Sequence, residues 1–530
     1  MSSTTDVAHS PTAFPVRSSS RLWLRYLVIA GVCALIVILV GTVLCAKYWP
    51  FSQKEIVEDL AEASDSKISI QGFHPTYFPV PGCVVYGIVF RHGQDQKELV
   101  TIQKLRIRGS YTGILRHYVP SVIAEGTHVF IPALGTKTTF NTQHSNIEIG
   151  EIVANGTLIE FASSDPKGSP LIFDIHDALL TGVRWASPIG YHLKFHNPNP
   201  PGEIAVAGKF GAWTDGHPDD TPLSGEFTFD KANLGIYDGI GGLLNAKGKF
   251  EGTLKHIDVS GATDTPDFEV KESGKKVDLR TQFQAYVDGR NGDTFLNHVD
   301  AKFGRTTVAV DGSIAHAAGR SGKLTKVHMT SHNGRVEDLL GLFISDPHSP
   351  MAGPVFLDAR AEFPSGNEGF LDRLHLSGQF VIGEGTFTHP DTQLDVDKLS
   401  AGARGKSKDA PDNVVTDLRG AVDMRRAIAD FSDLDFKIPG AHSKLHGTFN
   451  VENQRVNLHG NLRVDTSISN TSTGFKSFML KVLDPLFKKR KKGEIVPVHI
   501  MGTYQKPDIG LDLNKNDNKK PNQKKPDSGK

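Results

Sequence analysis

Cysteine and net charge are both scarce in this chain. Only three cysteines occur in 530 residues, and Cys33 and Cys45 fall inside one long apolar segment, which leaves Cys83 alone outside it. A disulfide framework is therefore excluded, and stability must come from backbone pairing and apolar burial. Basic and acidic residues balance at 59 each, so no net field favours nucleic acid as a partner.

Sequence fingerprints of catalysis are missing as well. The chain has no G-x-S-x-G elbow, no H-E-x-x-H helix, no Walker loop and no Rossmann glycine pattern. Its 22 histidines are scattered, and the pair His192 and His196 is followed at once by Pro198, which argues against a metal-binding helix there. We expect no enzyme and no bound cofactor or metal.

Long apolar runs are absent after residue 46, but one precedes it. Residues 27–46 contain neither a charge nor a proline, and such a run makes about 30 Å of helix, the thickness of a bilayer core. Arg21 and Arg25 precede the run, while Tyr48 and Trp49 follow it. Basic residues stay on the cytoplasmic side and amphipathic rings lie at the interface. The pattern predicts a single span with a cytoplasmic N-terminus and the bulk of the chain on the outer face.

A cleaved signal peptide is the alternative interpretation of this run. Signal peptides have an apolar region of about 7–15 residues and a small residue three positions before the cleavage site. Here the run is longer, and the bulky Leu44 occupies that position before Lys47. The residues favour a retained anchor.

After residue 66 the hydrophobic period changes to two. Alternating apolar and polar residues, bounded by Gly, Pro, Asp or Asn, recur at residues 67–70, 101–108, 301–310, 434–438, 456–458 and 462–464. This pattern is typical of many antiparallel strands joined by tight turns. The pairs Asp395/Asp397 and Asp433/Asp435 are interpreted as solvent-facing positions of such strands.

A short motif repeats among these strands: glycine, one polar residue, then an aromatic or aliphatic residue. Examples are Gly208-Lys209-Phe210, Gly225-Glu226-Phe227, Gly248-Lys249-Phe250, Gly378-Gln379-Phe380, Gly385-Thr386-Phe387 and Gly447-Thr448-Phe449. Glycine permits a bulge or bend, and the residue two positions later lies on the same face of the strand. Recurrence over some 300 residues favours one continuously curving sheet over separate compact barrels.

Helical patterns interrupt the strands at three places. Residues 55–63 and 336–344 predict short helices, the second one plugging or capping the sheet. Apolar residues at helical spacing recur from Phe475 to Phe487, with Phe478 among them, and a basic cluster follows at Lys488, Lys489, Arg490, Lys491 and Lys492. This segment predicts either a contact with an anionic membrane surface or a helix that caps the open end of the sheet.

Two stretches of the chain carry distinctive patterns of glycine and apolar positions. The first runs from the apolar segment through residues 72–82, 84–90, 105–115 and 125–129; the second covers about 353–513 and ends in Gly502-Thr503-Tyr504-Gln505-Lys506-Pro507. In these stretches the chain resembles the AsmA family of bacterial envelope proteins. Members of this family carry an inner-membrane anchor and a large β-rich periplasmic region, and they are grouped with the bridge-like lipid transfer proteins.

The resemblance implies a sheet rolled into a gutter that is apolar inside. The expected fold class is mainly β: an N-terminal transmembrane helix followed by an elongated, curved antiparallel β-sheet, gutter-like, with a few short helices. A β-sandwich core produces the same alternation and stays open as an alternative. In a gutter, the candidate lining residues are Phe250, Phe380, Phe387, Phe436 and Phe449.

The implied function is the handling of lipid, with phospholipid transport or support of outer-membrane assembly as the outcome. The expected location is the bacterial inner membrane, and the partners are membrane lipids and other envelope proteins. The alternative is a scaffold or chaperone for outer-membrane proteins that binds partner strands at its sheet edges. The expected organisation is a cytoplasmic stub (1–20), an anchor (21–49), an N-terminal AsmA-like region (50–150), a central β-rich region (151–350), a C-terminal AsmA-like region (351–513) and a basic tail (514–530).

Overall fold

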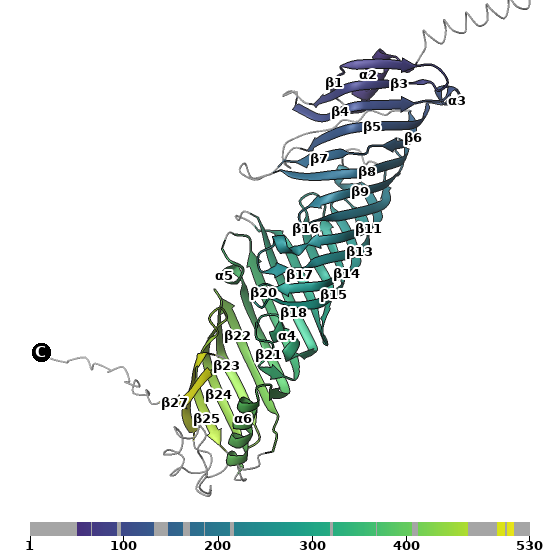
Figure 1. Ribbon diagram of the computed structural model, residues 1–530. Helices are drawn as coiled ribbons and strands as arrows, with labels where there is room; N and C mark the ends of the chain where they lie inside the picture. Colours follow the sequence, from purple (N-terminus) through teal and green to yellow (C-terminus); the bar gives the residue numbers. More distant parts are fainter. Residues whose placement is uncertain are drawn as a thin grey trace, which may run out of the picture.

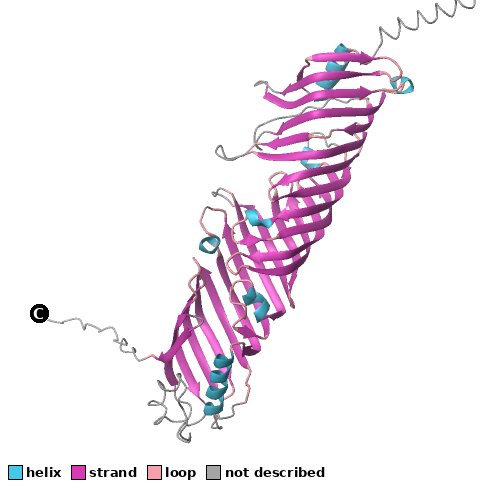
Figure 2. Cartoon of the chain, viewed as in Figure 1, coloured by secondary structure: helices cyan, strands magenta, loops and turns pink. Residues whose placement is uncertain are grey.

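One long, curved and twisted sheet makes up the body of the protein (Figure 1). The computed structural model describes residues 50–64, 66–92, 97–131, 147–162, 170–184, 186–212, 217–317, 322–366, 368–404, 412–464, 495–503 and 506–512. Over these residues the fold is mainly β, with a few short helices beside the sheet (Figure 2). The mainly-β, curved antiparallel part of the predicted fold class is confirmed. The expected transmembrane helix falls on residues 1–49, outside the described residues.

The N-terminal part begins with a helix that lies on the first strands. Its elements are α2 (Gln53–Ser64), β1 (Lys67–Ser69), β2 (Gly72–Thr76), β3 (Gly82–His92), β4 (Lys97–Arg108), α3 (Tyr111–Ile114) and β5 (Tyr118–Ile131). Both β1 and β2 pair with β3, and β3, β4 and β5 follow as antiparallel neighbours. The predicted helix at residues 55–63 is confirmed as α2.

One interruption of the antiparallel order follows β5. Strands β6 (Glu148–Val153) and β7 (Thr157–Phe161) both run parallel to β5 and antiparallel to β8 (Leu171–Val183). They therefore act as one broken strand between β5 and β8.

From β8 onward the chain is an antiparallel meander. The central strands are β9 (Ile189–Pro198), β10 (Pro201–Phe210), β11 (Pro222–Asn233), β12 (Ile240–Gly241), β13 (Leu243–Thr253), β14 (His256–Val270), β15 (Lys275–Asp288), β16 (Asp293–Phe303), β17 (Thr306–His316) and β18 (Lys323–Arg335), with the 3₁₀ turns η1 (Pro218–Asp220) and η2 (Leu234–Ile236). Each pairs with the next, except that the short β12 pairs with β14.

The C-terminal part continues this order and adds three helices. Its elements are α4 (Val336–Gly341), β19 (Met351–Ala352), β20 (Pro354–Pro364), α5 (Phe370–Arg373), β21 (His375–Phe387), α6 (Pro390–Ala403), β22 (Thr416–Arg425), β23 (Ile428–Ile438), β24 (Ala441–Asn450), β25 (Arg455–Val464), β26 (Ile495–Thr503) and β27 (Lys506–Leu511). At a spacing of about 4.8 Å, the whole stack of strands is on the order of 100 Å long. No helix in the described part of the chain is long and apolar enough to cross a bilayer.

Buried apolar clusters lie near the two ends of the sheet. In the N-terminal cluster, Phe51 and Ile56 pack against Val85, Leu105 and Val122, so α2 covers one face of β3–β5. Three further clusters lie in the C-terminal part, where α6, α4 and the residues around α5 cover the same face of β20–β26. None of these four clusters includes a residue of β8–β18. The structure is therefore a single sheet with a second layer only near its ends, not a sandwich.

Cross-strand register explains the repeated Gly-x-Phe motif. Strands β11 and β13 run antiparallel with Gly225 opposite Phe250 and Phe227 opposite Gly248, so each glycine meets the ring of its neighbour. A Cβ atom on Gly225 would lie 2.8 Å from Phe250 Cζ, and one on Gly248 would lie 2.9 Å from Phe227 Cε1. The missing side chains make room for the rings, whose contacts with the adjacent strand favour this register.

Three predictions about local structure are wrong. Residues 301–310 are not one strand, because Gly304, at φ +55°, makes a turn between β16 and β17. Asp395 and Asp397 lie on helix α6, which Pro390 and Asp391 begin favourably. Asp435 does lie on a strand, but its side chain does not face solvent: it is buried and bonded to Arg419 and His442.

The predicted helix at 336–344 is confirmed as the shorter α4, which packs on Val355 and Ile382. The segment from Phe475 to Lys492, with Phe478, Phe487, Lys488, Lys489, Arg490 and Lys491, lies outside the described residues, as do Arg21, Arg25, Tyr48 and Trp49.

The register argument predicts a stability effect at Gly248. We expect Gly248→Ala to destabilise the central strands by about 1–3 kcal/mol, because the added methyl group overlaps the Ser260 carbonyl oxygen and the Phe227 ring. Hydrogen exchange of the amides in β11–β14 measures the change.

Gly383→Ala is the matched control, since a Cβ there meets nothing within 4 Å. If the amides of β11–β14 were equally protected from exchange in the two variants, Gly248 would not be needed for the close packing of the Phe227 ring on β13.

Candidate functional site: an open apolar sheet face

Apolar residues form an unbroken row across the sheet. The row takes one residue from each paired strand from β8 to β26, leaving out the short β12 and β19. Its members are Ala178, Leu193, Val206, Phe227, Gly248, Gly261, Phe283, Val299, Val310, Met329, Ala359, Gly378, Val422, Phe431, Gly447, Leu458 and Ile500. Every position is aliphatic, aromatic or glycine, and we call it the central row.

A second row lies two residues along the strands, on the same face. It runs through Tyr191, Gly208, Gly225, Phe250, Val259, Ala285, Leu296, Gly312, Val327, Ala361, Leu376, Met424, Ala429, Phe449, Val456 and Gly502. Apart from the hydroxyl of Tyr191, it too carries no polar side-chain group. The two rows define what we call the apolar face.

Polar and charged residues occupy the opposite face. Lys194 pairs with Asp177 and Ala205, Thr228 with Lys247, and Asp300 with Gln282, each one position away from the central row. Alternation thus separates an apolar surface from a mostly polar one along the meander, with alanines such as Ala205 and Ala262 interspersed on the polar side.

In β8–β18 the apolar face is open. Phe195, Phe227, Phe250 and Phe283 are each only half-buried, and Ile314 is 37 % exposed. The rings contact one another: Phe173 and Phe195 have centroids 5.9 Å apart, and Phe227 and Phe250 have centroids 6.4 Å apart. An exposed contiguous apolar surface of this kind marks a site for an apolar ligand or partner.

The five candidate lining residues all lie on this face. Phe250 and Phe449 belong to the second row, Phe380 lies opposite Gly420, and Phe436 lies opposite Leu418 one row further. Phe387 follows the bulge of β21, and its ring centroid is 6.4 Å from that of Phe436.

Their surroundings differ, however. Phe250 lies in the open central part, whereas Phe380, Phe387, Phe436 and Phe449 pack against the clusters at the C-terminal end. The open part also contains Phe195, Phe227, Phe229 and Phe283, which were not among the candidates. Two of these could have been found from sequence, because Phe227 belongs to the motif Gly225-Glu226-Phe227 and Phe229 follows it at the next same-face position.

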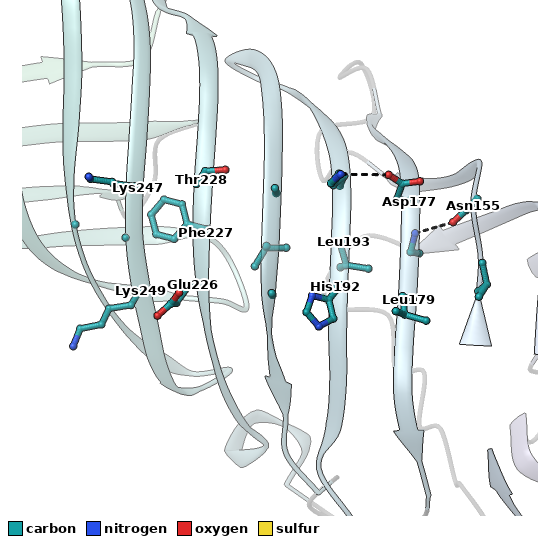
Figure 3. Close-up of a pocket in the computed structure, with 18 of the residues that line it drawn as sticks. Asn155, Asp177, Leu179, His192, Leu193, Glu226, Phe227, Thr228, Lys247 and Lys249 are labelled. Carbon is teal, nitrogen blue, oxygen red and sulfur yellow. Dashed lines mark hydrogen bonds and ion pairs between the residues drawn. The ribbon is translucent and has the colours of Figure 1, made fainter. Parts of the chain in front are cut away.

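A depression of about 1110 Å³ lies over β6–β14. Its lining combines central-row residues, such as Leu193 and Phe227, with residues that flank the row, among them His192, Glu226, Lys247 and Lys249 (Figure 3). The charges alternate in sign, and Lys194 Nζ lies 3.9 Å from Asp177 Oδ2. This mixed surface has no excess of one charge that would select an ionic ligand.

Histidines on the polar face pair with carboxylates of neighbouring strands. His196 Nδ1 lies 2.9 Å from Glu203 Oε1, and His328 Nε2 lies 2.9 Å from Asp358 Oδ1. Within the described ranges no three His, Cys, Asp or Glu side chains gather as a metal site would require. Burial raises the pKa of the Cys83 thiol to about 12, so this cysteine stays protonated and is no nucleophile.

Asp435 is a buried carboxylate of the C-terminal sheet with two charged or polar side-chain partners. Its oxygens accept a hydrogen bond from Arg419 Nη2 at 3.0 Å and lie 2.7 Å from His442 Nε2. Burial works to raise the pKa of Asp435, but the bonds to Arg419 and His442 outweigh it and leave the pKa below its ordinary value. The ionised carboxylate therefore ties β22, β23 and β24 together on the polar face.

Comparison with known proteins gives no relative: no family model, no curated protein and no solved structure matches the chain.

The lowered pKa of Asp435 predicts a pH-dependent contribution to stability. The contribution is complete above the unfolded-state pKa of about 3.9 and is lost as the pH falls through the lower folded-state value. We expect Asp435→Asn to destabilise β22–β24 by about 1–2 kcal/mol at pH 7 and by progressively less in acid. Hydrogen exchange of those strands, corrected for intrinsic rates, measures the difference.

Asp433→Asn is the control, because it makes the same change in charge at an exposed position of the same strand and face. A pH-independent difference between the Asp435 variant and the parent would contradict the assignment.

Proposed function

We propose that this protein binds the acyl chains of lipids along the apolar face and conveys phospholipid across the bacterial envelope, or supports outer-membrane assembly by doing so. The single observation that supports this is the central row, which stays apolar without a break and has no covering cluster over β8–β18. The proposed activity makes and breaks no covalent bond.

The energetics of burial agree with this proposal. A methylene group removed from water contributes about 0.8 kcal/mol, so a chain of some sixteen methylenes contributes on the order of 10 kcal/mol when it is fully covered. A charged head group remains in water if it stays at the rim of the sheet, where the strands end and polar turns begin. At about 4.8 Å per strand, the central row provides a path on the order of 80 Å long.

The membrane attachment is part of the same proposal. The uncharged run at residues 27–46 ends only four residues before Pro50, where the described chain begins. A single anchor in the inner membrane, with a cytoplasmic N-terminus and a periplasmic sheet, would place the N-terminal strands beside a source of lipid.

A scaffold for outer-membrane proteins is the second candidate. The sheet is open, so in the described residues β27 pairs only with β26, while β1 and β2 pair only with β3. Such edges offer backbone groups to a partner strand. This function uses the edges and leaves the apolar face without a role.

Lipid transfer by the full chain separates the two candidates. We expect Phe227→Glu/Phe250→Glu to lower the rate of phospholipid transfer between vesicles about tenfold or more, because a carboxylate on the surface that holds the acyl chains would have to lose its hydration. Native mass spectrometry of the purified chain measures bound phospholipid in parallel.

The matched control is Ser224→Glu/Thr228→Glu, which adds the same charges to the polar face of β11. Equal transfer by both variants, or a lipid-free chain that captures unfolded barrel proteins, would refute lipid transport and favour the scaffold.

A further inference from the structure

The two most exposed large apolar side chains recorded in the described residues lie at one corner of the N-terminal end, together with three others. Phe78 and Leu115 are each 84 % exposed, and Tyr77, Tyr111 and Val80 are 55 %, 52 % and 46 % exposed. These residues belong to the turn between β2 and β3 and to the segment from α3 to β5, beyond the ends of β3 and β4 (Figure 1). We call these five residues the N-terminal tip.

Backbone and side-chain bonds hold the two segments of the tip together. Gly82 lies opposite Arg108 in the ladder, so the turns that precede and follow these residues lie at the same strand end. Gly109 N donates to Pro81 O at 2.7 Å, and Tyr111 Oη donates to Tyr77 O at 2.5 Å. The exposure of the tip is thus a property of a fixed structure.

The chain enters the sheet at the same corner. Phe51 is buried, and its ring fills the space where a Cβ of Gly109 would be. In sequence, Ala46 ends the uncharged run five residues earlier, and five residues span at most about 18 Å. The tip therefore lies close to where a membrane span would leave the bilayer, with Tyr48 and Trp49 between them.

The two segments that form the tip contain no acidic residue. Neither residues 72–90 nor residues 105–124 contain an aspartate or a glutamate, and Arg108 and Arg116 are exposed beside the apolar residues. Glu148 lies opposite Tyr118 in the ladder, and its backbone N donates to His117 O at 2.9 Å. The acidic residues of α2 begin at Glu55, four residues after Phe51. Aromatic and aliphatic side chains next to arginine match the interface of a bilayer with anionic head groups.

We propose that the N-terminal tip inserts into the lipid–water interface of the membrane that holds the anchor. Phe78 and Leu115 lie below the head groups, Tyr77 and Tyr111 lie among them, and Arg108 and Arg116 contact lipid phosphates. The first strands then sit directly on the bilayer, so that the apolar face starts at its surface. This inference rests on the membrane attachment proposed above but not on lipid transport.

Site-directed spin labelling of the full chain tests the insertion. The variant used for labelling has Cys33→Ala and Cys45→Ala and retains the buried Cys83. It is reconstituted into vesicles of phosphatidylethanolamine and phosphatidylglycerol. Nitroxides are placed through Phe78→Cys, Leu115→Cys and, as control, Ile236→Cys, which is 47 % exposed on η2. Collisions with oxygen, which is soluble in lipid, and with a water-soluble nickel chelate report depth.

We expect the labels at 78 and 115 to collide with oxygen and to be protected from nickel, at a depth of about 5–10 Å, while the label at 236 stays accessible to nickel. Nickel accessibility at 78 and 115 equal to that at 236 would overturn the proposal. Protection from both reagents would overturn it too, because it would show a protein or a second copy over the tip.

In a second measurement the nitroxide is attached at a residue of the tip other than Phe78 and Leu115. With the nitroxide at Val80→Cys, the additional change Phe78→Glu/Leu115→Glu should shift the oxygen-to-nickel ratio to the value at residue 236. An unchanged ratio would contradict insertion. Phospholipid transfer is measured on the same samples, so a failed insertion and a failed transport function remain distinguishable.

Discussion

Strand register is the constraint on which this structure depends. Because side chains alternate between the two faces, a slip of one residue in any strand would turn its apolar residues toward the polar side. Bulges keep the phase: in β23, Phe431 and Leu434 are three positions apart yet both face the apolar side, because the ladder shifts between them. A similar shift separates Leu296 from Val299. The sheet can therefore twist and curve without mixing its two surfaces.

The two surfaces are stabilised in different ways along the molecule. At the ends, helices such as α2 and α6 provide a second layer, and side chains such as Val85 and Val496 are almost fully buried. In the middle, ladder hydrogen bonds on both sides of each strand and ring-over-glycine pairs take the place of that layer. A large apolar surface left in water is costly, and a lipid occupant would remove that cost. This is the physical link between the open middle and the proposed function.

Much of the fold was predictable from local pattern, and the failures have physical causes. Alternation indicated the strands, and the amphipathic segment at 55–63 indicated α2. The turn at Gly304 was missed because apolar residues alternate on both sides of it, although the alternation shifts by one residue between Phe303 and Val308. Helix α6 was missed because its carboxylates at 395 and 397 imitate strand alternation, whereas Asp397 is in fact buried and accepts a bond from Val414 N. The membrane-surface candidates from Phe475 to Lys492 remain a prediction.

The sequence by itself determined that this protein is built of many short antiparallel strands with one apolar and one polar side, because alternation and turn residues are local properties. It also contained the repeated motif in which an aromatic residue follows a glycine by two positions. Only the tertiary structure decided that glycine of one strand meets the ring of the next, that helices cover the apolar face near the ends and leave the middle open, and that Phe78 and Leu115 share a corner with Phe51. Those facts depend on pairing between residues distant in the chain, which no local pattern encodes.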